Sequence, residues 1–211
     1  MVDLSLLSQA IDGGDREKTV QLTAEALGAG TNPQEIITQG LQAGMAVVGE
    51  KFSNGEYFLP DMLMAARAMK AALEVLKPSL EETGIPTIGK VVIGTVEGDM
   101  HDIGKNVVAT FLSGNGFEVF DLGLNVPVQN FIDEVKEKKP DILGMSALLT
   151  TTMPVMSKVI KALEEIGMRS SVKVIVGGAP VTQDYANYIG ADAYAHDGGK
   201  AVPACRKLLG K

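Results

Sequence analysis

The residues best suited to chemistry lie in one short polar segment, EGDMHDIGKN at 97–106. His101 supplies an imidazole, which can bind a metal or exchange a proton near neutral pH. Asp99 lies two residues before it. In an extended loop, a carboxylate at that spacing can hydrogen-bond one ring nitrogen and leave the other for a ligand. A second polar segment, SALLTTTM at 146–153, begins with a further candidate, Ser146.

The elements that must position these residues are short apolar runs that alternate with segments of helical length. This alternation predicts a parallel sheet flanked by helices, most often a flavodoxin-like sheet of five strands in the order 2-1-3-4-5. Ligands bind beyond the carboxyl ends of the strands in such sheets, between the first and the third. The topology therefore brings Asp99, His101 and Ser146 to one crevice. The expected strands lie at 90–96, 117–123, 141–146 and 173–178, with a weaker fifth near Ala193–Ala195.

In the first part of the chain, the spacing of the apolar residues predicts helices through residue 77. Asn32-Pro33 is typical of a helix start, and a later helix is expected to begin near Leu59-Pro60-Asp61. Four short helices with tight connections favour a small bundle. Residues 78–89 contain two prolines and no clear period, which indicates a linker. We therefore expect a helical domain at 1–88 and a flavodoxin-like domain at 89–211.

Composition narrows the class of partner. The chain has 19 basic and 26 acidic residues and a net charge of −7, which argues against nucleic acid and anionic membranes as partners. The single cysteine, Cys205, excludes an intrachain disulfide and a zinc site built from thiolates. The first residues lack a basic signal-peptide region, and no apolar run approaches membrane-spanning length. A reducing cytoplasm is the expected location.

The residues present exclude three common kinds of binding site. A phosphate-binding P-loop would have four residues between its glycines and a Ser or Thr after the lysine, but five separate Gly98 from Gly104, and Asn106 follows Lys105. A phosphoacceptor receiver domain would need an aspartate where Ser146 stands. A conventional metal site needs three or four converging protein ligands, which one histidine cannot supply.

Cobalt held in a corrin ring has a smaller requirement. The macrocycle already provides four nitrogen ligands, so the protein needs to add only one axial imidazole. His101 is then sufficient by itself, and Asp99 would orient it. Ser146 would hydrogen-bond Asp99 and extend the relay.

These residues resemble the motifs of cobalamin-binding domains, which have the pattern D-x-H-x-x-G, S-x-L and G-G on three strand ends. Here the pattern reads Asp99 to Gly104, Ser146-Ala147-Leu148 and Gly177-Gly178. The chain is similar to the B12 module of methionine synthase. Over nearly its whole length it is also similar to the stand-alone corrinoid proteins of methanol, methylamine, glycine-betaine and methoxyarene methyltransferase systems. Gly49–Phe52 and Tyr57–Pro60 resemble the helical cap of those proteins.

The resemblance implies a cofactor, cobalamin or a related corrinoid, and a site for it. His101 would replace the dimethylbenzimidazole base as the lower cobalt ligand, and the displaced nucleotide tail would enter a slot near Gly177 and Gly178. Phe58, Leu59 and Met62 would cover the methyl-bearing face. The other implied contacts with the cofactor are Gly98, Asp99, Met100, Asp102, Ile103, Gly104, Ser146, Leu148 and Thr150.

The resemblance also implies a function as a methyl carrier that is inactive alone. Co(I) would accept a methyl group from a substrate:corrinoid methyltransferase, and methyl-Co(III) would pass it to a second methyltransferase with tetrahydrofolate or a thiol as acceptor. A reductive activator would restore oxidised cobalt. Three alternatives stay open: a mutase module, which lacks this cap, a B12-sensing regulator, which should carry a basic DNA-binding domain, and a storage or chaperone protein.

Overall fold

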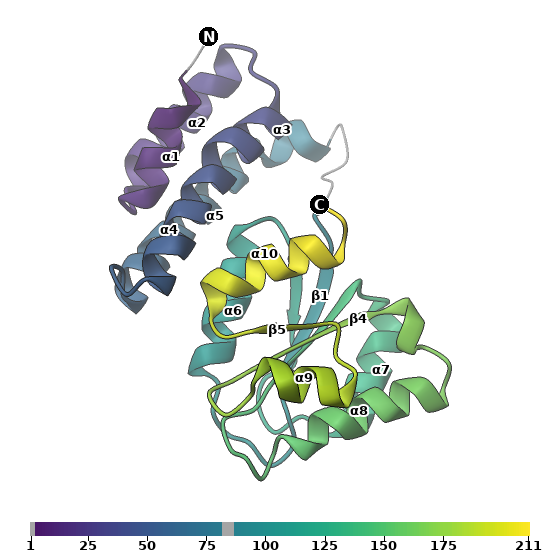
Figure 1. The fold of residues 1–211 in the computed structure, drawn as a ribbon. Helices are drawn as coiled ribbons and strands as arrows, with labels where there is room; N and C mark the ends of the chain where they lie inside the picture. The colour runs from purple at the N-terminus through teal and green to yellow at the C-terminus, as the bar shows by residue number, and fades with distance from the viewer. Residues whose placement is uncertain (1–2, 82–86) are drawn as a thin grey trace. The chain divides into compact units, whose positions relative to one another are not determined.

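The chain folds into two compact units, Met1–Pro86 and Thr87–Lys211 (Figure 1). The structure is a computed structural model that describes residues 3–81 and 87–211. The first unit is helical, and the second is an α/β unit with one parallel sheet.

The helical unit has the expected four-helix arrangement, with the third helix built from three consecutive segments. Side chains at Asp3, Asp15 and Asn32 cap the first three helices by accepting hydrogen bonds from backbone N–H groups in the first turn. The segments are α1 Leu4–Asp12, α2 Arg16–Gly28, α3 Pro33–Glu35, η1 Ile36–Gln42, α4 Ala43–Ser53 and α5 Leu59–Glu81.

Two features of this unit were not predicted. The middle of the third helix, η1, is a π-helix, and a Cβ on Gly40 would lie 2.6 Å from the Leu7 side chain of α1. A larger residue at this position would therefore displace the Leu7 side chain. The predicted start of the linker at Pro78 is wrong, because α5 continues through Pro78 to Glu81. Five of the twelve residues of the predicted linker, 82–86, lie outside the described residues.

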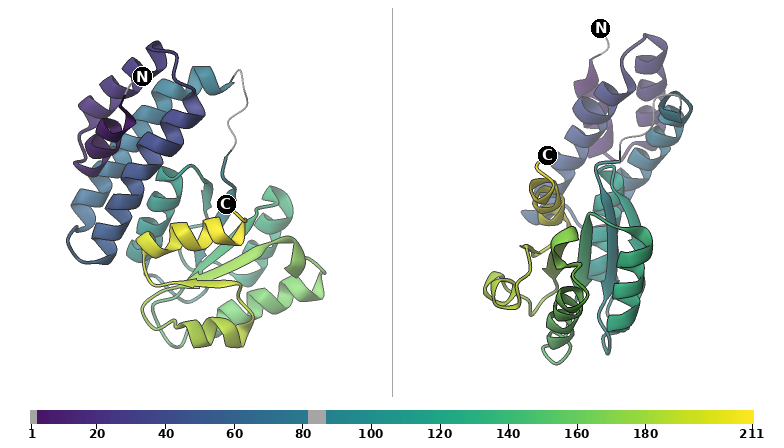
Figure 2. Two further views of the ribbon diagram at one scale, coloured as in Figure 1. Left: turned by 45° about the horizontal axis from the view of Figure 1, so that its top comes forward. Right: turned by 90° about the vertical axis from the view of Figure 1, so that its right-hand side faces the viewer.

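The α/β unit confirms the predicted flavodoxin-like sheet. Its strands are all parallel and lie in the order β2-β1-β3-β4-β5 (Figure 2). Helices α6 and α10 cover one face, and α7, α8 and α9 cover the other. The strands are β1 Lys90–Thr95, β2 Glu118–Asp121, β3 Ile142–Ser146, β4 Lys173–Gly177 and β5 Ala193–Ala195. The helices are α6 Ile103–Gly114, α7 Val128–Lys138, α8 Pro154–Glu165, η2 Arg169–Ser171, α9 Gln183–Ile189 and α10 Gly198–Leu208.

The register of the sheet brings the central strand ends level. Thr95 of β1 pairs with Ser146 of β3, which pairs with Gly177 of β4. Strand residues such as Val92 and Leu143 are fully buried and pack with Phe131 of α7 in one hydrophobic core. The buried strands therefore hold the loops that follow β1, β3 and β4 at one edge of the sheet.

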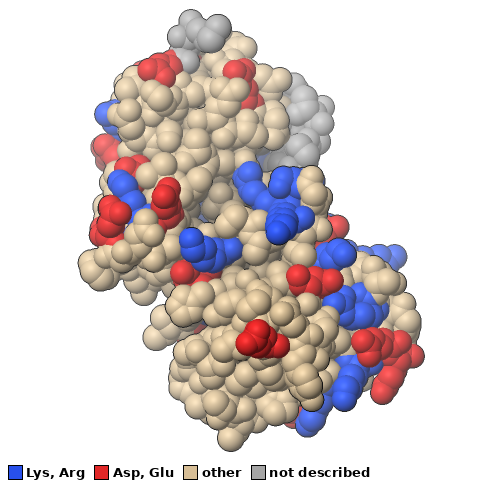
Figure 3. Space-filling view, in the orientation of Figure 1, with Lys and Arg blue, Asp and Glu red and all other residues tan. Residues whose placement is uncertain are grey.

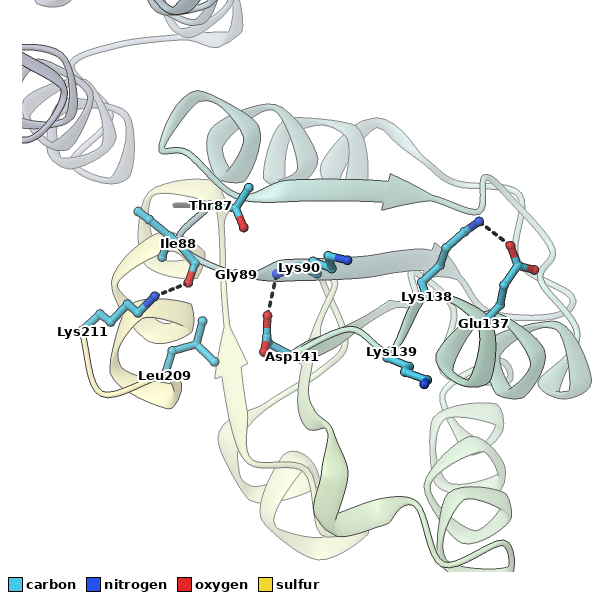
Figure 4. A pocket seen from close by; sticks show the side chains of 10 residues that line it. All are labelled: Thr87, Ile88, Gly89, Lys90, Glu137, Lys138, Lys139, Asp141, Leu209 and Lys211. Atoms are coloured by element: carbon cyan, nitrogen blue, oxygen red, sulfur yellow. Dashed lines mark hydrogen bonds and ion pairs between the residues drawn. The ribbon is translucent and has the colours of Figure 1, made fainter. Parts of the chain in front are cut away.

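The opposite edge of the sheet carries a polar pocket of about 640 Å³ (Figure 4). Its polar groups are largely satisfied within the chain. Lys211 Nζ donates to the Ile88 carbonyl at 2.7 Å, and the Lys90 backbone N–H donates to the Asp141 carboxylate at 2.7 Å. This pocket lies at the amino ends of the strands, away from the loops that contain His101 and Ser146.

The surface carries charges of both signs. On the described face drawn in Figure 3, basic and acidic side chains alternate along the right-hand border of the α/β unit and form no continuous basic strip. Within residues 3–81 and 87–211, no helix is long and apolar enough to cross a membrane.

Candidate functional site

The loop that follows β1 orients His101 through a buried carboxylate. The Asp99 side chain is fully buried, and its Oδ1 lies 2.8 Å from His101 Nδ1. The same oxygen accepts the His101 backbone N–H at 3.1 Å. Because an ionised carboxylate can only accept hydrogen bonds, we assign the ring proton to Nδ1. This assignment leaves the lone pair on Nε2, and the His101 side chain is 50% exposed.

The loop that follows β3 holds the other oxygen of Asp99. Asp99 Oδ2 accepts hydrogen bonds from Thr152 Oγ1 at 2.7 Å, from Leu148 N at 2.7 Å and from Leu149 N at 3.1 Å. Burial by itself would raise the pKa of Asp99. The hydrogen bonds from Thr152, His101 and the Leu148 amide outweigh burial and hold that pKa well below its usual range. Asp99 therefore stays ionised and keeps accepting from the imidazole.

Thr152, and not the predicted Ser146, is the residue whose hydroxyl donates to Asp99. Among the described residues, the Ser146 side chain makes no hydrogen bond to Asp99, so the predicted contact is wrong. Ser146 ends β3, where its carbonyl accepts from Val96 N at 3.0 Å, whereas the Asp99 carboxylate faces the turn over 148–152. Thr152 lies two residues before Pro154, which starts α8, but nothing in the sequence separates it from the other hydroxyl residues of 146–153. A hydroxyl in that turn can reach a neighbouring loop.

Exposed apolar side chains lie on the same two loops as the Asp99–His101 pair. Met100 in the first loop is 65% exposed, and Ile103, where that loop enters α6, is 71% exposed. Leu148 and Leu149 in the second loop are each 41% exposed. Large apolar side chains seldom stay exposed together unless a ligand or partner covers them. We call these four side chains the apolar collar.

The remaining predicted residues of the two loops are accessible or half-buried. Gly98 has φ +83°, a conformation that favours glycine. Asp102 Oδ2 accepts from Asn106 Nδ2 at 3.0 Å, Gly104 is exposed in the first turn of α6, and Thr150 is exposed.

The two glycines after β4 have a packing role of their own. A Cβ on Gly178, which has φ +118°, would lie 1.9 Å from the Ala147 carbonyl oxygen. A Cβ on Gly177 would lie 2.7 Å from the Ala195 carbonyl oxygen. The family resemblance implies that these glycines line a slot for the nucleotide tail of the cofactor. Close approach of neighbouring backbones already requires them.

The three residues predicted for the helical unit differ in exposure. Phe58 is 68% exposed and Leu59 is 37% exposed, so both can contact a ligand. Met62 is fully buried. It therefore offers no surface to a ligand in this conformation. The turn before Phe58 is fixed by Lys51, whose Nζ donates to Asp12 Oδ2 at 2.7 Å and to Tyr57 Oη at 3.2 Å.

No metal site built from protein ligands alone was found in the part of the chain that the structure describes. Within residues 3–81 and 87–211, no group of three or more His, Cys, Asp or Glu side chains converges on a point. The residues at the site fit a group that brings its own equatorial ligands. They offer one oriented, accessible imidazole nitrogen with apolar side chains on the same loops.

Comparison with known proteins identifies the family. Residues 89–206 match the family model of the B12 binding domain, and residues 4–77 match a second model with the same description. The chain therefore belongs to the B12-binding domain family. This result confirms the resemblance found in the sequence and the expected cofactor, cobalamin or a related corrinoid.

Its relatives include corrinoid proteins of Methanosarcina species. The chain is 48% identical over 202 residues to trimethylamine corrinoid protein 1 of Methanosarcina mazei, covering 95% of this chain and 94% of the relative. It is 50% identical over 179 residues to dimethylamine corrinoid protein 1 of Methanosarcina acetivorans, covering 84% of each.

Comparison with solved structures also finds cobalamin-related proteins. A cobalamin-binding protein from Desulfitobacterium hafniense matches with a TM-score of 0.87 and 38% identity over 99% of both chains. A methanol:cobalamin methyltransferase complex from Methanosarcina barkeri matches with a TM-score of 0.81 and 33% identity, over 98% of this chain and 79% of that one.

Proposed function

We propose that this protein is a corrinoid methyl carrier that holds cobalt through Nε2 of His101. The observation that carries the proposal is the half-exposed imidazole, fixed by the ionised Asp99 in a chain of the B12-binding family. A bound corrinoid would supply a cobalt centre that takes a methyl group from a donor and gives it to an acceptor. The protein would supply His101 to hold the cobalt, Asp99 to orient that imidazole, and protection of the centre from water.

The Asp99–His101 pair controls how strongly Nε2 can donate to a metal. Donation of the Nδ1 proton to Asp99 fixes the plane of the ring and leaves the Nε2 lone pair free for a metal. Thr152 and the amides of Leu148 and Leu149 hold the carboxylate in turn. A proton arriving at Nε2 would compete with the metal for the same lone pair.

The apolar collar supports this reading, because a corrin has broad apolar edges. Covering Met100, Ile103, Leu148 and Leu149 would remove apolar surface from water, worth roughly 25 cal/mol per Å². It would also exclude water from the site. We also propose that the nucleotide tail of the cofactor enters a slot near Gly177 and Gly178.

We propose that the helical domain, residues 1–88, acts as a cap for the domain at 89–211. The exposed Phe58 and Leu59 suit contact with the methyl-bearing face of a corrinoid. The methyl group must be reached twice in each cycle, so the cap has to move aside between the two transfers.

The partners and the methyl donor follow from the class of carrier. We propose a substrate:corrinoid methyltransferase, a second methyltransferase acting on tetrahydrofolate or a thiol, and a reductive activator, all in the cytoplasm. The methanol:cobalamin methyltransferase complex among the structural neighbours supports the first of these. The names of the relatives favour methylated amines as donors, ahead of methanol and methoxyarenes.

Transfer of a methyl group separates a carrier from a storage protein. The protein loaded with cobalamin and reduced to Co(I) would be mixed with trimethylamine and a trimethylamine methyltransferase. Methylated cobalamin should form on the protein only when the methyltransferase is present, with parallel reactions for dimethylamine, methanol and a methoxyarene. Formation of no methylcobalamin with any donor enzyme, together with release of intact cobalamin to another apoprotein, would favour storage.

A further inference from the structure

The loop that contains His101 is held on two sides, and the mechanism above uses only one of them. On the β3 side, Asp99 binds the turn over 148–152. On the β2 side, Asn125 makes two hydrogen bonds to the same loop. Its Oδ1 accepts the Gly98 backbone N–H at 2.7 Å, and its own N–H donates to the Asp99 carbonyl at 3.1 Å.

Asn125 is itself held firmly. Its φ is 50°, a left-handed conformation that Asn adopts more readily than most residues. The next residue, Val126, forms a bridge with Val96, and its N–H donates to the Thr95 carbonyl at 2.9 Å. Thr95 N donates in turn to the Gly123 carbonyl at 3.0 Å. The segment that carries Asn125 thus runs beside the end of β1 as an extension of the sheet.

A partly buried ion pair links the other end of the His101 loop to the end of β2. Lys105, in the first turn of α6, has a side chain that is only 1% exposed, and its Nζ contacts both Asp121 oxygens at 2.5 Å. Asp121 also accepts the Gly123 N–H at 2.9 Å. The end of β2 and the segment that follows it therefore contact the chain both before and after His101.

We propose that Asn125 is a positioning residue for His101, acting through the backbone of Gly98 and Asp99. This inference rests on the proposed function, because it concerns the geometry with which Nε2 meets cobalt. A loop held only through Asp99 could still pivot about that carboxylate. The second attachment at Gly98 removes this freedom, so less ordering remains to be done when the ligand binds.

The test compares two substitutions that both tolerate a positive φ. Asn125→Gly removes the acceptor for Gly98 and keeps the backbone hydrogen bond to Asp99. Asn125→Asp keeps an oxygen at the same place. Lys139→Gly is the matched control, because Lys139 has φ 47° and lies at the opposite edge of the sheet. Each variant would be titrated with hydroxocobalamin, its methylcobalamin form scored by visible spectrum for histidine ligation, and its thermal midpoint measured.

We expect Asn125→Gly to bind hydroxocobalamin about fivefold more weakly, because a loss of this size corresponds to one hydrogen bond. At equal loading it should also show a smaller histidine-ligated fraction. Asn125→Asp and Lys139→Gly should match the wild type in both readouts. If Asn125→Gly matches Asn125→Asp while the wild type binds with histidine ligation, this inference is overturned and the proposed function stands. A wild type that retains no cobalamin would overturn both.

Discussion

Asp99 links the two loops of the site, and its ionisation should be visible in the stability of the protein. Its pKa in the folded chain lies below the ordinary value of 3.8, because hydrogen bonds from Thr152, His101 and Leu148 outweigh the effect of burial. As pH falls, the unfolded chain therefore takes up the proton first. The stabilisation by Asp99 is complete above its ordinary pKa and is lost as pH falls through the folded pKa.

Asp99→Asn should remove this pH dependence. The variant cannot ionise, and its amide group would face the donors on Leu148, Leu149 and Thr152. We expect it to be less stable than the wild type at neutral pH by roughly 1–3 kcal/mol. The difference should shrink as pH falls from about 5 to about 3. Urea unfolding of both apoproteins across this range measures it. A constant difference would mean that Asp99 is not held ionised by the contacts described.

Thr152 offers a matched pair of substitutions at the residue scale. Thr152→Val keeps the shape and removes the hydroxyl that donates to Asp99 Oδ2 at 2.7 Å, whereas Thr152→Ser keeps the hydroxyl. Valine should cost about 1–2 kcal/mol in unfolding free energy and lower the histidine-ligated fraction of methylcobalamin. Serine should restore the spectrum. Equal spectra for the two variants would show that the hydroxyl does not act on His101.

At the scale of elements, the strand ends around the site depend on close backbone contacts. Gly178→Ala should destabilise the protein by about 3 kcal/mol or more, because the new Cβ would meet the Ala147 carbonyl oxygen at 1.9 Å. Gly190→Ala is the control, since Gly190 also has a positive φ, +77°, but no atom within 4 Å of an added Cβ. That control should lose only about 1 kcal/mol. Similar losses for both in urea unfolding would contradict the close contact.

The elements themselves were largely predictable, because their signals are local. Alternation of apolar strands and helical segments predicted the sheet order, including the short strand at Ala193–Ala195. The D-x-H spacing predicted the contact between Asp99 and His101. Which hydroxyl reaches Asp99 was not predictable, because Ser146 and Thr152 lie in the same polar segment and only the path of the turn separates them. The π-helix η1 and the continuation of α5 through Pro78 likewise depend on tertiary packing that overrides local preference.

In the whole molecule, the proposed cap should protect the bound cobalt centre from oxidation. Phe58 is 68% exposed, so Phe58→Ala should change the unfolding free energy by no more than about 0.5 kcal/mol. It should nevertheless speed the oxidation of Co(I) in the loaded protein, followed by visible absorbance after reduction. Tyr188→Ala, at a residue 84% exposed on α9, is the control and should leave that rate unchanged. Equal rates for both variants would remove Phe58 from the cap.

The central claim is that His101 binds cobalt, and one spectrum tests it most directly. Purified wild type and His101→Ala would be reconstituted with hydroxocobalamin and methylcobalamin, freed of excess cofactor and compared by visible absorbance. We predict stoichiometric retention by the wild type and a methylcobalamin spectrum of the histidine-ligated form that is absent from the His101→Ala protein. No retained corrinoid in the wild type, or identical spectra for the two proteins, would contradict the assignment of His101 as the cobalt ligand.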